Sequence, residues 1–241
     1  MLVGVDAAAL EWRVCVELAK DYVGIDEIVG GLDTHTRNQE AFDLPSRSIA
    51  KKYLFRTIYR GSGYAFSVDP EFMHVSKNPK FWDDIGEKFY SKYHGINSWH
   101  MSMAEKVSQG TDIVTPFGRK WNFELKRNYR GELELPWTVF TNYPVQGTGA
   151  DVMTIARVSF RNRLRKLGWP VLLISTVHDS IVVDCPDDYV ERVTKLFYDV
   201  FDDLVTNIRR LFKYDWETPL DGEVKYGPNM NDMKKLLRKD L

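Results

Sequence analysis

Two aspartates stand where apolar segments typical of buried strands come to an end. Asp6 closes the run Leu2-Val3-Gly4-Val5, and Asp179 lies in a His178-Asp179-Ser180 turn between two further apolar runs. Carboxylates that point out of a sheet from strand ends suit Mg²⁺, a hard cation that prefers oxygen ligands and shares them with substrate phosphates. A turn or capping role would explain either aspartate alone. The two together therefore make a metal site a hypothesis worth pursuing.

The segment 47–60 is basic and also carries aromatic side chains. It holds five cations, and no acid occurs between Asp43 and Asp69. Steps of four residues place two cations and two aromatic rings on one helical face. These residues are Arg47, Lys51, Phe55 and Tyr59. Such a face suits a nucleotide, with the triphosphate on the charges and the base against a ring. A solvated basic face is the alternative, although such faces usually alternate in sign.

A third segment, Gln146-Gly147-Thr148-Gly149, precedes a run of residues with helical spacing that ends at Leu167. The glycines would allow a close backbone approach at the start of this helix. Alone the signal is weak, because an ordinary loop-to-helix junction explains it. Five further cations gather along the same helix, where a surface stripe is the alternative. They are Arg157, Arg161, Arg163, Arg165 and Lys166.

The elements that must position these residues are strands at both ends of the chain and helices between them. Strands are predicted over residues 2–6, 171–175, 181–183 and 218–225, and a hairpin or small sheet over 111–135. Helices are predicted over 10–20, 47–60, most of 70–108 with a start at Asp69-Pro70-Glu71, 147–167 and 188–212. The simplest architecture is a sheet built from both chain ends with a helical insert.

The composition indicates a globular protein with a packed core. Of 241 residues, 44% are hydrophobic and 28% charged, which excludes disorder, collagen and coiled coil as overall descriptions. The net charge of −1 excludes a protein that coats nucleic acid through overall basicity. Cys15 and Cys185 lie far apart without CxxC or HExxH motifs, which argues against zinc sites and disulfides. No apolar run approaches the ~20 residues of a membrane span, so we expect a reduced, cytoplasmic protein.

Taken in order, these pieces resemble the motifs of family A DNA polymerases, the DNA polymerase I-like group, with spacings similar to those of phage replicative enzymes. Asp6-Ala-Ala-Ala-Leu-Glu11-Trp-Arg13 resembles motif A, Asp33-Thr34-His35 the D-x-H segment before the fingers, and Arg47 to Tyr59 motif B. Asn142 to Gly147 resembles the N-x-P-x-Q-G segment that opens a long palm helix, Val177-His178-Asp179 motif C, and Gly227-Pro228-Asn229 the closing G-x-N.

The resemblance implies an α+β fold, with a palm that is an antiparallel sheet with packed helices and with a helical fingers insert. It implies neither a thumb nor an exonuclease domain in this chain. The palm would comprise residues 1–20, with motif A, and 111–241, with the motif C hairpin at 171–184. The fingers would comprise residues 21–110, with the motif B helix at 47–60. The implied reaction is two-metal nucleotidyl transfer, in which a primer 3′-hydroxyl attacks the α-phosphorus of a dNTP.

The resemblance also implies a role for each motif residue. Asp6, Asp179 and the backbone carbonyl of Ala7 would hold two Mg²⁺ ions. Arg47, Lys51 and His35 would neutralise the triphosphate, with Lys51 as the proton donor to the leaving pyrophosphate. Glu11 and Tyr59 would exclude a ribose 2′-hydroxyl, and Phe55 would favour dNTPs over dideoxy analogues. Gln146, Asn142, His178 and Arg13 would contact primer–template DNA, where the minor groove tests pair shape without reading sequence.

The chain departs from the family pattern at four positions. Ser180 stands where motif C usually has Glu, Arg56 and Arg60 stand where motif B usually has Gly, and Thr138 takes a place often held by Arg. We expect two-metal chemistry to survive on Asp6 and Asp179. The geometry beside the templating base is left open by the two arginines.

Two other functions compete with a DNA polymerase. Glu11 argues against an enzyme like the single-subunit RNA polymerases, and the retention of both aspartates with Arg47 and Lys51 argues against a non-catalytic, polymerase-derived DNA-binding subunit. Because motif A begins almost at Met1, we expect a split polymerase. A second polypeptide would supply the thumb, the remaining palm and, in the fullest form of the hypothesis, the exonuclease. A shortened chain and a compact polymerase without a thumb are the alternatives.

Overall fold

The computed structural model describes the backbone of residues 1–241 and every side chain except that of Asp240. Two compact units divide the chain: Met1–Leu10 with Thr148–Leu241, and Glu11–Gly147. The sequence patterns placed the boundaries at 20 and 110 instead. The shift toward 147 follows from the core of the second unit, because Phe123 and Phe140 pack there with Met103 and Val107.

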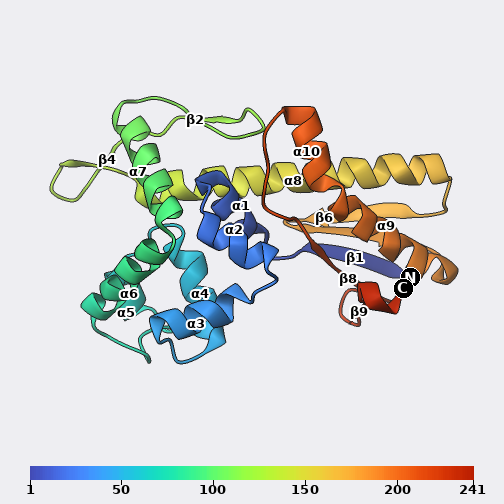
Figure 1. The fold of residues 1–241 in the computed structure, drawn as a ribbon, viewed down its shortest axis with the longest axis horizontal. Helices are drawn as coiled ribbons and strands as arrows, with labels where there is room; N and C mark the ends of the chain where they lie inside the picture. Colours follow the sequence, from blue (N-terminus) through green and yellow to red (C-terminus); the bar gives the residue numbers. More distant parts are fainter. The chain divides into compact units, whose positions relative to one another are not determined.

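The first unit is built on a five-stranded antiparallel sheet with the order β6-β7-β1-β8-β9 (Figure 1). Its strands are β1 (Leu2–Ala7), β6 (Leu172–Val177), β7 (Ser180–Asp184), β8 (Gly222–Gly227) and β9 (Lys234–Lys235). The strand made first therefore lies in the middle, between two strands from the far end of the chain. In this register Asp6 lies opposite Ser180 on one side and opposite Glu223 on the other. The predicted sheet from both chain ends is confirmed.

One face of this sheet carries its apolar core. Val3, Val5 and Val224 are buried in this core, and β1 and β8 both pack against helix α9 (Val190–Asp202). Phe197 of α9 stacks on Phe160 of helix α8 (Trp137–Leu167), with ring centroids 4.1 Å apart. The single helix predicted over 188–212 is instead three elements, a 3₁₀ turn at Asp187–Tyr189, α9 and α10 (Leu204–Phe212). The break between α9 and α10 falls at Asp203, whose carboxylate accepts a hydrogen bond from Arg163.

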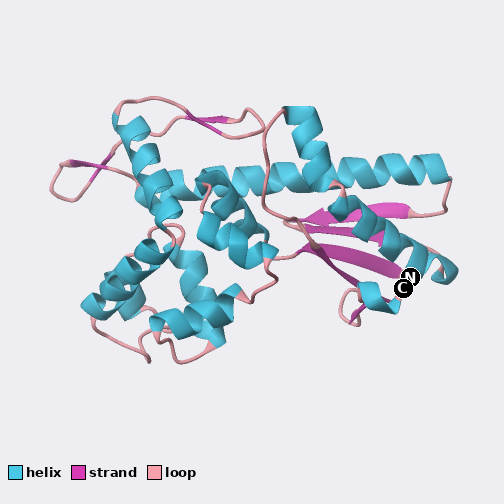
Figure 2. Cartoon of the chain, viewed as in Figure 1, coloured by secondary structure: helices cyan, strands magenta, loops and turns pink.

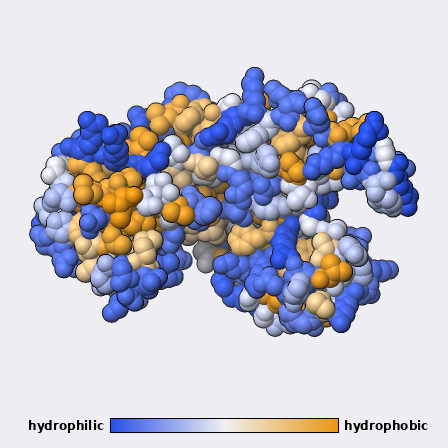
Figure 3. All heavy atoms as spheres, turned by 180° about the vertical axis from the view of Figure 1, so that it is seen from behind, coloured by the Kyte–Doolittle hydropathy of each residue, from blue (hydrophilic) through white to orange (hydrophobic). Residues whose placement is uncertain are grey.

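The outer strand β6 leaves part of the unit's surface apolar. β6 is an edge strand of the sheet and exposes Leu172, Ile174 and Val177. Figure 3 shows a hydrophobic patch on this unit, in the region where Figure 1 places β6. A register shift between Leu173 and Ser175 also interrupts the pairing of β6 with β7. Such irregularities are a common way to blunt an edge strand against unwanted pairing.

The second unit is mostly helical (Figure 2). It contains α1 (Leu10–Ala19), α2 (Tyr22–Val29), α3 (Thr34–Phe42), α4 (Arg47–Thr57), α5 (Gly63–Val68), α6 (Pro79–Lys92), α7 (His94–Ser108) and the first part of α8. The predicted small sheet over 111–135 is two short hairpins, β2 (Ile113–Val114) with β3 (Lys120–Trp121) and β4 (Lys126–Arg127) with β5 (Leu133–Glu134).

Side-chain caps explain where several of these helices begin. Asp21 caps two of them, because its carboxylate accepts from the N–H of Gly24 at 2.9 Å in α2 and from that of Ile96 at 3.2 Å in α7. The predicted helix start at Asp69 is wrong. The Asp69 carboxylate accepts from the N–H of Glu71 and from Arg56, which fixes a turn, and α6 begins only after the cap residue Asn78.

Arg60 explains how the chain leaves α4. Its φ of 59° lies in the left-handed region that favours glycine, the residue expected at this place in motif B. The guanidinium is held inside the unit, where it donates to Nδ1 of His100 at 3.2 Å and to Oδ1 of Asn97 at 2.7 Å. It also lies over the rings of Tyr90 and Trp137. These contacts anchor an arginine in a conformation that most side chains avoid.

Lower pH is expected to destabilise the protein through His100. Complete burial, with a contribution from Arg60, lowers the pKa of His100 to about 3. The unfolded chain binds this proton near pH 6.5, so stability is complete above that pH and is lost as pH falls toward 3. The expected loss between pH 7 and pH 5 is about 2 kcal/mol. Urea unfolding at both pH values should show this difference, and His100→Gln should remove most of it. An equal pH dependence in both proteins would contradict the assignment.

Candidate functional site

The two predicted metal ligands lie side by side in the first unit. Asp6 is near the end of β1, and the backbone N–H of the next residue, Ala7, donates to the carbonyl of Asp179 at 2.9 Å. Asp179 sits in the β6–β7 turn, where His178 has a φ of 52°. This left-handed residue lets the chain reverse within two residues and sets Asp179 beside β1. The sequence prediction that both aspartates occupy strand ends of one sheet agrees with this geometry.

Ser180, the departure from motif C, has a local role. Its hydroxyl donates to the carbonyl of Val177 at 2.9 Å and so closes the turn before β7. The carboxylate of Asp6, which lies opposite Ser180, forms an ion pair with Lys225 of β8, with 3.2 Å between Nζ and Oδ2. Glu223, the other neighbour of Asp6, pairs with Lys235 at 2.6 Å. Neither lysine was predicted as a site residue, because neither belongs to a motif.

The donor set around Asp6 fits a hard cation that shares its ligands with a substrate. Among the described residues, no group of three or more His, Cys, Asp or Glu side chains could hold a metal ion. The chain therefore offers two carboxylates and the carbonyl of Ala7, all oxygen donors. Mg²⁺ is commonly bound in this way, by one or two carboxylates with waters and substrate phosphates in the remaining positions.

The predicted nucleotide face lies in the second unit, on α4. Ser46 caps the helix by accepting from the N–H of Ile49 at 3.2 Å. Arg47 is held by Asp33, with Nε–Oδ2 at 2.5 Å and a second contact at 3.2 Å. This hydrogen-bonded pairing holds the pKa of Asp33 well below its usual range. Lys51 is exposed and forms no ion pair with the side chains that the structure describes.

His35 lies beside this face. Its ring centroid is 5.9 Å from that of Phe55, and its Nδ1 is buried without a hydrogen-bond partner among the described groups. Burial, followed by the charge of Arg47, lowers the pKa of His35. The ring is therefore neutral at pH 7, and a hydrogen-bonding role fits it better than the cationic one implied by the sequence.

The other cations of the segment do not share the face of Lys51. Arg56 pairs with Asp69 at 2.5 Å and with Glu71 at 3.4 Å, and Lys52 pairs with Glu71 at 2.5 Å. These acids lie outside the helix, so the basic segment 47–60 alone did not indicate that its cations form ordinary surface ion pairs. The predicted helix 47–60 also ends early, at Thr57, and Tyr59 lies in the turn beyond it.

Three of the predicted site residues meet in the second unit. The side-chain amide of Gln146 donates to the carboxylate of Glu11 and, at 3.1 Å, to Oη of Tyr59. Burial, followed by the charge of Glu11, raises the pKa of Tyr59, whose phenol stays neutral. The sequence assigned Gln146 to DNA and did not link it to the other two residues. A link across 135 residues leaves no local signal.

The glycine segment does not open a helix, as the sequence suggested, but lies within one. α8 begins at Trp137 and includes Pro144, and Asn142 lies half-buried one turn before Gln146. A Cβ at Gly147 would approach the ring of Trp121 to 3.1 Å, so the glycine does permit close packing. Arg13 is half-buried on α1.

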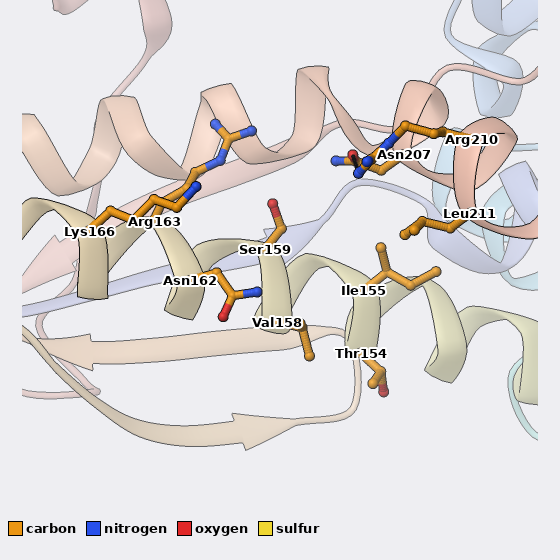
Figure 4. A pocket seen from close by; sticks show the side chains of 10 residues that line it. All are labelled: Thr154, Ile155, Val158, Ser159, Asn162, Arg163, Lys166, Asn207, Arg210 and Leu211. Atoms are coloured by element: carbon orange, nitrogen blue, oxygen red, sulfur yellow. Dashed lines mark hydrogen bonds between the residues drawn. The ribbon is translucent and has the colours of Figure 1, made fainter.

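The basic residues of α8 belong to the first unit. No acid occurs between Asp151 and Asp179, and a hollow of about 400 Å³ runs between α8 and α10 (Figure 4). Arg163, Lys166 and Arg210 line it, with Ile155 of α8 and Leu211 of α10 turned toward one another. None of the residues predicted to bind metal, nucleotide or DNA lines this hollow.

Within the described residues, no helix is both long enough and apolar enough to cross a membrane.

The family model for DNA polymerase family A matches residues 1–232, and the chain belongs to that family. The resemblance drawn from the motifs is thus confirmed, and so is the α+β fold class.

Known relatives agree with this assignment. The chain is 26% identical over 242 residues to DNA polymerase I of Chloroflexus aurantiacus, covering 97% of this chain and 24% of that protein. It is 24% identical over 253 residues to a DNA polymerase of Bacillus phage SP01, covering 100% of this chain and 27% of the relative. Thus the chain spans about a quarter of the length of these relatives.

A solved structure shares the fold. It is the POL domain of Pol1 from M. smegmatis in complex with DNA primer-template and dNTP, with a TM-score of 0.77 and 18% sequence identity. The match covers 94% of this chain and 39% of the solved one.

Proposed function

We propose that this chain carries the catalytic part of a template-directed DNA polymerase, which adds dNTPs to a primer 3′-hydroxyl in a phage-type replication system. The observation that carries the proposal is the pair of aspartates at one end of the sheet, with Asp6 near the end of β1 and Asp179 in the adjacent β6–β7 turn. Membership of family A and the similarity to a phage polymerase support it. The palm would comprise residues 1–20 and 111–241, and the fingers residues 21–110.

Asp6, Asp179 and the carbonyl of Ala7 would hold two Mg²⁺ ions. When bound, these ions would stabilise the attacking and leaving oxygens of an in-line displacement. The protein's own contribution is to hold two exposed carboxylates at fixed positions, which the β1–β7 pairing provides.

The residues of α4 would serve the triphosphate. Lys51 is exposed and available for phosphate, and Arg47 is oriented by Asp33. As the primer oxygen forms its bond to the α-phosphorus, the bond to the bridging oxygen breaks, and Lys51 would give its proton to the departing pyrophosphate. His35, being neutral, would add a hydrogen bond. Gln146, Asn142, His178 and Arg13 would contact the primer–template.

Primer extension separates this function from its competitors. The purified protein should extend a DNA primer on a DNA template with dNTPs and Mg²⁺. Extension with ribonucleotides in preference to dNTPs would indicate the RNA polymerase alternative, which Glu11 disfavours. Binding of primer–template without extension by either nucleotide would indicate a non-catalytic subunit.

A second polypeptide remains part of the proposal. The exposed apolar residues of β6 would suit coverage by another chain. Co-expression with neighbouring gene products, followed by size-exclusion chromatography and primer extension, tests it. An active monomer that binds primer–template tightly without any partner would contradict it.

Phe55→Tyr is expected to increase the incorporation of dideoxynucleotides relative to dNTPs. Phe55 is half-buried on α4 beside His35 and lacks a phenolic hydroxyl. A tyrosine there would supply a hydrogen-bonding group in place of the missing sugar 3′-hydroxyl. Single-nucleotide incorporation kinetics measure the ratio, with Tyr64→Phe, on an exposed side chain of the same unit, as the control. An unchanged ratio would show that Phe55 does not face the sugar.

A further inference from the structure

The metal ligand Asp6 already has a cationic partner in the chain. Lys225 lies opposite Gly4 in the β1–β8 register, two residues from Asp6 and therefore on the same face of the sheet. Its ammonium group reaches Oδ2 of Asp6 at 3.2 Å.

A cation at this position reduces the repulsion between neighbouring carboxylates. Asp6 has Glu223 directly opposite on β8, and Asp179 lies nearby in the β6–β7 turn, so three acidic residues occur at this end of the sheet. Like charges in such positions repel. Lys225 neutralises Asp6, and Lys235 neutralises Glu223 at 2.6 Å.

We propose that Lys225 is the built-in counter-cation of the metal site, which holds Asp6 in the metal-free protein and gives up that carboxylate when Mg²⁺ binds. Lys225 and the metal compete for the same oxygen, so the lysine sets the Mg²⁺ concentration at which the site fills. Lys225 acts through Asp6 and is thus a positioning residue. This inference rests on the proposed metal site at Asp6 and Asp179.

Lys235 provides a matched control for the charge. It faces Lys225 in the β8–β9 register, has the same charge and is also paired with a carboxylate. Its partner, Glu223, is not a proposed metal ligand. Lys235→Met therefore removes one positive charge from nearly the same place and leaves the partner of Asp6 unchanged.

The test is calorimetric titration of MgCl₂ and MnCl₂ into the protein without DNA or nucleotide. Lys225→Met should bind the ions about threefold to tenfold more tightly, since it removes both a competitor and a like charge near a divalent cation. Lys225→Arg should remain close to the wild type, and Lys235→Met should change affinity less than about twofold. Unchanged or weaker binding by Lys225→Met would overturn the proposal, as would an equal gain in Lys235→Met.

Thermal unfolding provides a second readout. In EDTA, Lys225→Met should melt below the wild type because three carboxylates then lack one counter-charge, and added Mg²⁺ should recover more of the melting temperature than in the wild type. If Lys225→Met does not fold, Lys225→Gln takes its place in both measurements. Asp6→Asn tests the proposed metal site itself. If it binds ions as the wild type does, the proposed metal site is wrong, and the role of Lys225 falls with it.

Discussion

Replacing Asp6 or Asp179 with asparagine is expected to reduce primer extension at least about 1,000-fold, because each replacement removes a charged metal ligand and with it several kcal/mol of transition-state stabilisation. Primer–template affinity should change little, because neither carboxylate is expected to attract DNA. Extension rates at saturating dNTP and Mg²⁺, together with DNA binding by fluorescence anisotropy, measure both quantities.

Asp184 provides the control for this pair. It lies at the other end of β7, opposite Leu2, and its carboxylate contacts the N-terminal amine. Asp184→Asn makes the same chemical change in the same sheet and should keep extension within about twofold of the wild type. Near-normal extension by Asp6→Asn or Asp179→Asn would refute the metal assignment.

Glu11→Ala is expected to raise incorporation of ribonucleotides relative to dNTPs by about 100-fold, the scale on which a shaped pocket discriminates a single small group. The structure gives a reason beyond the bulk of Glu11. Its carboxylate accepts from the amide of Gln146, which also holds Oη of Tyr59. Loss of the carboxylate would free both partners and open the wall against the 2′-hydroxyl. Steady-state incorporation of paired rNTP and dNTP substrates measures the ratio.

Tyr59→Phe separates the wall from its hydrogen bonds. The phenyl ring keeps its bulk and loses only the contact with Gln146, so we expect discrimination to weaken much less than in Glu11→Ala. A ratio unaffected by Glu11→Ala would place the sugar elsewhere. An effect of Tyr59→Phe equal to that of Glu11→Ala would assign the selectivity to the hydrogen bonds instead.

Strand-end residues were predictable because local patterns determine them. The apolar run before Asp6 defines a strand end, and the tight turn around Asp179 defines a hairpin. The pairing of β1 with β7 then brings the two aspartates to the same end of the sheet, as expected. The cap at Ser46 likewise marked the start of α4. These features depend on neighbours in the sequence, for which a single chain carries sufficient information.

Contacts between distant residues were not predictable in the same way. The pairing of Lys225 with Asp6 depends on the register of β1 and β8, and the sequence patterns predicted the last strand several residues too early. The acids that neutralise Arg56 and Lys52 come from the turn that follows Asp69, where a helix was predicted. The early start of α8 at Trp137 was hidden by Pro144, which normally argues against a helix interior.

The central position of β1 has a consequence for how the protein is made. Its two neighbours, β7 and β8, are synthesised much later than β1, and roughly 200 residues separate β1 from β8. At 5–20 residues per second, the ribosome needs about 10 to 40 s to deliver that final neighbour. The helical unit Glu11–Gly147 is continuous and can form during this interval, whereas an apolar β1 must wait without partners. Nascent chains that stop before Gly222 should therefore expose β1 to chaperones and aggregation, and the sheet should gain protease resistance only once β8 has left the ribosome.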